Sequence, residues 1–261
     1  MGDRGPIWSL ERGPIGALRL KSAQDAYARR DTQEAVTEAE ELLDHEPDND
    51  QALLIVADGS LELGQPEVAR VAYAEYLEMR PEDALGWAGM AVAAYEVTDL
   101  HGCIEAAEKS MALNDEGAEA WYYKGLALEH LGRRDEADIC FLQASRRDGQ
   151  SFPLVAEVSD AVFAAALAEA LLVLPQDLRD WLEPIALKVE ELPELAELRR
   201  AIPPLSPSAG ALYEGTPPEE DPIDDVPTSI RLYRRNIARA ASYGADLVFL
   251  LAHALRQEAL D

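Results

Sequence analysis

Basic residues, cysteine and long apolar runs are all scarce in this sequence, and each scarcity disfavours a class of protein. The 261 residues include 23 Lys and Arg against 50 Asp and Glu, which gives a formal net charge of −27. Nucleic acids and anionic membranes require a basic contact surface, so we expect neither as a partner. Two cysteines, Cys103 and Cys140, are too few for a disulfide framework, and we expect both to be small, at least partly buried hydrophobic residues.

Targeting signals and common catalytic motifs are also missing. The most apolar stretch, Val162 to Leu174, contains Glu169 and is shorter than the ~20 residues that a membrane span needs. The first residues, Met1 to Pro6, have neither the apolar run of a signal peptide nor the Ser or Thr of a myristoylation site. No G-x-S-x-G, phosphate-binding loop or dinucleotide fingerprint occurs. We therefore expect a soluble, cytoplasmic protein without a cofactor.

A period of 34 residues runs through the first half of the chain. Pro47 and Pro81 are 34 apart, and so are Trp87 and Trp121. A column of small residues has the same step, as expected where two helices approach closely, and Gly64 and Gly132 lie two steps apart at the expected helix–helix turns. The small column consists of Ala35, Ala69, Cys103 and Ala137.

These features resemble the tetratricopeptide repeat (TPR) family over residues 16–150, in four units at 16–49, 50–83, 84–117 and 118–150. The fourth unit matches best, with Trp121, Gly125, Ala137, Phe141 and Ala144 at the family's positions. The first is atypical, because Arg19 and Ala23 replace the Trp and Gly. Residues 1–15 are then an N-terminal extension. The resemblance implies an α-solenoid that binds proteins on its concave face.

In this family the first helix of each repeat lines the concave face, so the resemblance assigns a set of groove positions. Carboxylates and tyrosines dominate these positions, and Gln24 and Glu119 belong to the wider set. We expect a basic or amphipathic protein segment as the ligand. An open alternative is that the acids are merely solvated and the tyrosines pack between repeats. The groove set is Tyr27, Leu54, Asp58, Glu62, Tyr95, Glu96, Tyr122, Leu126 and Glu129.

The period fails after about Arg147, and the residues from 160 onward predict a small α+β domain after a junction at 151–159. We expect a helix over 160–174 capped by Ser159, a short helix at 178–182 and a final helix from about Ala245. Alternating patterns predict strands at 184–190, 210–215 and 229–233. An acidic, proline-flanked connector covers 219–225.

The order of these elements resembles the compact zincin-like metallopeptidases of bacteria over residues 160–261. The resemblance rests on Leu174-Pro175, Ile185 to Glu190, Leu212 to Pro217 and Ile230 to Arg234, followed by a helix that begins near Asp246. It implies a zincin-like fold, which by itself does not imply activity.

Active members of that family carry H-E-x-x-H on the last helix, where two histidines bind zinc and the Glu is the general base. Here the matching residues are His253-Ala254-Leu255-Arg256-Gln257, so the base and the second ligand are replaced. The resemblance therefore implies a degenerate domain without catalytic residues and with His253 as a vestige. We expect a core or capping role for His253, with metal binding through Glu258 or Asp261 as a remote alternative.

Four arginines, Arg231, Arg234, Arg235 and Arg239, oppose the overall charge. They can form weak ion pairs with the acidic connector or another nearby face. They can also dock onto the acidic groove, within one chain or between two copies, which would allow a homo-oligomer.

Three functional hypotheses follow. The leading one is a non-enzymatic adaptor with a TPR groove and a pseudopeptidase domain. A second is a zinc-dependent metallopeptidase with a divergent metal site, and a third is a regulator that binds a peptidase or its substrates without cleaving them.

Overall fold

The chain forms two compact units, residues 1–148 and residues 149–261, each with its own packing. The structure is a computed structural model that describes residues 12–114, 116–155, 157–200, 205–214, 229–242 and 246–257. Among these residues, no helix has the length and apolar character needed to cross a bilayer.

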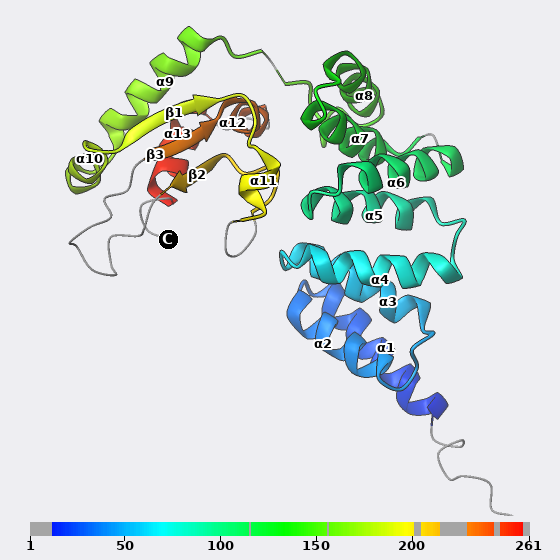
Figure 1. The fold of residues 1–261 in the computed structure, drawn as a ribbon. Helices are drawn as coiled ribbons and strands as arrows, with labels where there is room; N and C mark the ends of the chain where they lie inside the picture. Colours follow the sequence, from blue (N-terminus) through cyan, green and yellow to red (C-terminus); the bar gives the residue numbers. More distant parts are fainter. Residues whose placement is uncertain are drawn as a thin grey trace, which may run out of the picture. The chain divides into compact units, whose positions relative to one another are not determined.

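Eight helices in four consecutive pairs make up the described part of the first unit (Figure 1). Each pair packs internally and against the next pair, as a solenoid requires. The first helix begins at Arg12, four residues before the expected start of the first repeat. The helices are α1 (Arg12–Ala28), α2 (Thr32–Leu43), α3 (Asp50–Glu62), α4 (Pro66–Met79), α5 (Ala84–Glu96), α6 (Leu100–Leu113), α7 (Ala118–His130) and α8 (Arg134–Arg147).

The turn inside each pair has the same backbone conformation in all four repeats. Gly64 and Gly132 have φ of 70° and 75°, and Arg30 and Thr98, 34 residues from a glycine, both have φ of 62°. A positive φ is easy for glycine and strained for other residues. The repeat therefore imposes its turn even where the sequence provides no glycine.

Small residues let the helices of a pair approach closely. The column Ala35, Ala69, Cys103 and Ala137 is buried, as its spacing predicts. A Cβ atom on Gly125 would lie 2.8 Å from the Phe141 ring, so this glycine makes room for the aromatic residue of the same repeat. Cys103 and Cys140 are both buried and unpaired, and burial raises the pKa of the Cys103 thiol to about 12.

The described part of the second unit combines five helices with a three-stranded sheet. The strand order is β1-β3-β2, in which β3 pairs parallel with β1 and antiparallel with β2. The three strands and the three helices expected from the sequence are present, and α11 and α12 are additional. The elements are α9 (Asp160–Val173), α10 (Gln176–Leu182), β1 (Ala186–Glu190), α11 (Leu195–Leu198), β2 (Ala211–Glu214), β3 (Ser229–Tyr233), α12 (Arg234–Ala241) and α13 (Leu247–Gln257).

The core of the second unit forms around the central strand. Ile230 and Leu232 of β3 are buried together with Leu251 and Leu255 of α13 and Phe163 of α9. The neighbouring strand residues Ser229 and Tyr233 are buried as well, so both faces of β3 are covered. The alternation in its sequence therefore does not mark a solvent-facing side.

Candidate functional site

One face of α3 carries the most accessible part of the predicted groove. Gln51, Leu54, Asp58 and Glu62 follow each other at steps of three and four residues, which places them in a row along the helix. Glu62 is exposed, and Leu54 and Asp58 are half-buried. Tyr27, from the facing side of α1, is also half-buried.

Two carboxylates on this face are held by hydroxyl groups. The Tyr73 hydroxyl donates a hydrogen bond to Asp58 Oδ1 over 2.5 Å. Tyr27 and Thr32 donate to the two oxygens of Glu62, over 3.1 and 2.7 Å. We call Tyr27, Asp58, Glu62 and Tyr73 the acid cluster. Its hydroxyl groups orient the carboxylates without neutralising them.

The protein environment disfavours negative charge at the acid cluster. Burial raises the pKa of Asp58 and outweighs the opposing effect of the Tyr73 hydrogen bond, and the charges of Glu62 and Asp83 raise it further. Burial, the hydrogen bond to Glu62 and the nearby carboxylates raise the pKa of Tyr27 to about 12. The site therefore concentrates negative potential and keeps this phenol neutral.

Glu119 at the start of α7 extends the acidic surface. Desolvation raises its pKa, and the negative charge of Asp58 adds to the increase. Carboxylates from the second and fourth repeats therefore lie within electrostatic range of each other. A cation between them would relieve their repulsion.

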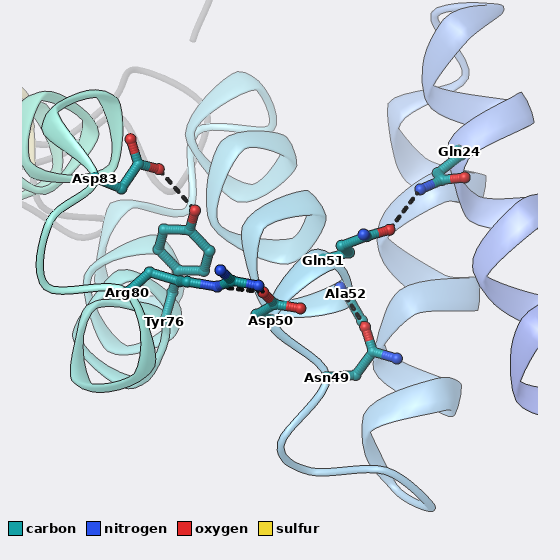
Figure 2. A network of polar contacts seen from close by, with 8 residues as sticks. All are labelled: Gln24, Asn49, Asp50, Gln51, Ala52, Tyr76, Arg80 and Asp83. Carbon is teal, nitrogen blue, oxygen red and sulfur yellow. Dashed lines mark hydrogen bonds and ion pairs between the residues drawn. The ribbon is translucent and has the colours of Figure 1, made fainter.

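The other end of the α3 face borders a hollow of about 630 Å³ (Figure 2). Arg80 Nε donates to Asp50 Oδ2 over 2.6 Å, and the Tyr76 hydroxyl donates to Asp83 Oδ2 over 2.6 Å. Leu54, a predicted groove residue, lines this hollow together with Met79 and Pro81. The face thus offers apolar surface beside the carboxylates.

Three predicted groove residues do not reach the surface, and their assignment as groove contacts is wrong. Tyr95, Leu126 and Glu129 are all less than 4% exposed. The Tyr95 ring packs edge-on against Tyr123 at 5.7 Å between centroids, and its hydroxyl lies 3.3 Å from His130 Nε2.

The end of α7 is enclosed on every side. Residues 125–129 are all buried, and successive helix residues point about 100° apart, so no direction is left open. Glu96 and Tyr122 are half-buried. The accessible candidate site therefore lies mainly on the first two repeats.

Sequence reasoning did not place Tyr73 or Thr32 in the site. Tyr73 stands at the position of a buried repeat aromatic, and its ring is indeed buried. A Cβ atom on Gly89 would lie 2.2 Å from the Tyr73 hydroxyl, so the next repeat leaves room for that oxygen. The signal was the hydroxyl itself, because a core position that needs only an apolar ring would suit phenylalanine.

The arginine cluster of the second unit has carboxylate partners on nearby elements. Arg231 lies 2.5 Å from Glu197 and 3.7 Å from Glu190. Arg234 pairs with Asp160 and Glu191, and Arg235 Nε lies 3.5 Å from a Glu191 oxygen. Arg239 donates to Asn236 Oδ1 over 3.2 Å. Local ion pairing therefore occurs on a nearby face, whereas residues 219–225 lie outside the described residues.

His253 lies on the exposed side of α13, so the expectation of a core or capping role is wrong. Its ring stacks on Phe249, one helical turn earlier, with 6.2 Å between centroids and 2° between planes. Phe249 is itself 65% exposed. Residues 258–261, with the alternative ligands Glu258 and Asp261, lie outside the described residues.

Comparisons with known proteins identify both parts of the chain. Residues 182–259 match the family of zincin-like metallopeptidases. The first part resembles Superkiller complex protein 3 of Mus musculus, 36% identical over 72 residues, and Tetratricopeptide repeat protein 28 of Mus musculus, 26% identical over 108 residues. The chain joins tetratricopeptide repeats to a zincin-like domain. These matches cover 28% and 41% of the chain but only 5% and 4% of the two relatives.

A solved structure supports the TPR fold. The structure described as MamA protein superposes with a TM-score of 0.50 at 18% identity, and the match covers 64% of this chain and 86% of MamA. At this level of identity the likeness concerns the fold alone.

The described part of the zincin-like domain does not fit a catalytic zinc ion. No group of three or more His, Cys, Asp or Glu side chains converges there in a metal-binding arrangement. Ala254, next to His253, has no group that could accept a proton. The chemistry of a zinc hydrolase therefore finds neither a ligand set nor a base among these residues.

Proposed function

We propose that the protein is an adaptor whose TPR unit binds a basic or amphipathic segment of a partner protein. The observation that carries the proposal is the row of residues on α3, where Leu54 lies between the apolar hollow and the carboxylates Asp58 and Glu62. This arrangement offers contact area and negative charge side by side.

The electrostatics favour a cationic ligand. Asp58 and Glu119 are both desolvated, and the charge of Asp58 raises the pKa of Glu119, so an incoming Lys or Arg would relieve unfavourable charge as well as form ion pairs. Leu54 and the half-buried ring of Tyr27 supply surface for the aliphatic part of such a side chain.

Peptide binding tests the proposal directly. The probe is a fluorescent amphipathic peptide of Lys, Leu and Ala, and a Glu, Leu and Ala peptide of the same pattern is its charge control. Asp58→Asn with Glu62→Gln is expected to weaken binding of the Lys peptide roughly tenfold by anisotropy, because two carboxylates are lost but the hydrogen-bond acceptors remain.

Glu75→Gln with Glu78→Gln is the matched control, since both residues are exposed on α4, away from the α3 face. It should leave the affinity unchanged. Equal losses in the two double variants, or equal affinity for the Lys and Glu peptides, would contradict a specific acidic site.

We further propose that the zincin-like domain acts without peptide cleavage, as a second contact surface. The supporting observation is Ala254 at the position of the family's general base, together with Gln257 at that of the second zinc ligand. The family match at 182–259 favours the second candidate, an active zinc metallopeptidase. Elemental analysis of the purified full chain separates the two: stoichiometric zinc that is lost on His253→Ala would establish the metal site and refute the proposal.

A further inference from the structure

The second unit contains a hollow that the adaptor proposal does not use. It measures about 590 Å³ and lies between α9 and β1, which run alongside each other (Figure 1). We call it the α9–β1 groove. One end is acidic and the rest is apolar. Its lining is Asp160, Phe163, Ala164, Leu167, Ala168, Leu171, Val189, Glu190, Glu191 and Arg234.

The helix beside this groove is more apolar than its packing requires. Asp160 and Glu169 are the only charged residues in α9. Phe163, Ala166 and Ala170 are buried, whereas Leu172 is 71% exposed and Ala164 and Ala168 of the groove are also exposed. A helix that is apolar all round is normally covered all round, so the exposed surface of α9 is suited to contact with another protein.

The strand beside the groove lies at an edge of the sheet. Within the described residues β1 is hydrogen-bonded to β3 alone, since the order is β1-β3-β2. Val189 of β1 lines the groove and is 47% exposed. An open edge with an apolar side chain can accept another extended chain, which gains backbone hydrogen bonds from the edge and side-chain contacts from the groove.

The charges at the acidic end select among possible occupants. Asp160, Glu190 and Glu191 meet there with the single cation Arg234, which pairs with Asp160 and Glu191. An excess of negative charge remains. A second copy of this chain, at a net charge of −27, is a poor electrostatic match for that end, whereas a Lys or Arg of another protein complements it.

We infer that the α9–β1 groove binds an extended apolar segment of a partner protein, which adds a strand to β1 and places a basic residue against Asp160, Glu190 and Glu191. This site is independent of the acid cluster, because its residues belong to the other unit. It gives the non-cleaving domain a defined contact surface.

The test uses the full-length, isotope-labelled chain and a short acetylated peptide that alternates Val and Thr and ends in two lysines. Backbone NMR shifts are expected to concentrate on α9 and β1, with a dissociation constant below about 1 mM. Two matched peptides follow: one with alternate backbone amides N-methylated and one with Glu in place of Lys. Each is expected to bind at least tenfold more weakly, because the first cannot extend the sheet and the second is repelled.

Ala168→Glu places bulk and charge inside the groove and should abolish these shifts. Ala165→Glu is the matched control, since Ala165 is exposed on the same helix but does not line the groove. No binding at 1 mM, an equal effect of both variants, unimpaired binding of the N-methylated peptide or shifts confined to α3 would each overturn the inference. So would a concentration-dependent self-association that Ala168→Glu removes, because the occupant would then be a second copy.

Discussion

Asp58 is a residue whose charge costs folding stability in exchange for a binding function. The acid is half-buried, and the protein environment favours its protonated form. Such a group persists where activity requires it, although the fold alone would be more stable without its charge.

This cost is expected to depend on pH. Because the pKa of Asp58 is raised in the folded state above its ordinary value of 3.8, the penalty is fully present above the folded pKa and disappears as the pH falls toward 3.8. Asp58→Asn keeps the acceptor for Tyr73 and removes the charge. Its free energy of unfolding, measured with urea, should exceed that of the wild type at pH 7, and the difference should shrink toward pH 4.

Glu75→Gln on α4 serves as the comparison, since it removes an exposed carboxylate outside the acid cluster. If Asp58→Asn destabilises the protein at every pH, the hydrogen bond from Tyr73 to the ionised carboxylate outweighs desolvation, and the sign of the argument is wrong.

At the scale of the element, the four repeat turns separate backbone strain from side-chain packing. Gly64 has a φ of 70°, and nothing lies within 4 Å of the place where its Cβ would be. Gly64→Ala should therefore cost roughly 1 kcal/mol through the backbone alone. Arg30→Gly, at a φ of 62°, should stabilise by up to about 1 kcal/mol for the same reason.

Chemical denaturation of the two variants measures both effects against one wild-type curve. Gly132→Ala repeats the first change in the fourth repeat, where the Cβ position is equally open. Effects of the same sign for Gly64→Ala and Arg30→Gly would mean that side-chain contacts, rather than φ, control these turns.

The same elements show how far sequence reasoning reaches. The helix pairs were predictable because a period of 34 repeats the same small residues, such as Ala35 and Ala69, at each close helix approach. The three strands were predictable from alternation. In contrast, α12 follows β3 directly at Arg234, with no Gly or Pro between them to signal a change of structure, and α11 has only four residues.

The candidate site was less predictable than the fold. Repeat position indicates which residues lie on the first helix of each pair, and it correctly brought Asp58, Glu62 and Tyr27 together. It does not show which parts of that surface are closed. Tyr95 is lost to Tyr123 and His130, and such contacts depend on packing between repeats rather than on periodicity.

For the molecule as a whole, the charge of −27 is a source of self-repulsion in the compact state. Some acids contribute local stability, since Asp31 and Asp99 accept hydrogen bonds from backbone N–H groups at the starts of α2 and α6. The excess remains large. Screening should therefore stabilise the fold.

We expect the urea midpoint of the first unfolding transition to rise as NaCl increases from about 10 to 150 mM, because the Debye length falls from about 30 to 8 Å. Urea is the suitable denaturant, since it leaves ionic strength unchanged. A midpoint that falls with salt would show that ion pairs such as Arg80 with Asp50 outweigh the repulsion.

Both thiols of the chain belong to one unit, Cys103 in α6 and Cys140 in α8, and both are shielded from water. Alkylation by a small reagent therefore has to wait until these helices separate locally. The rate of labelling at each sulfur thus provides a built-in clock for transient opening of the third and fourth repeats, without any engineered probe and without interference from the rest of the chain.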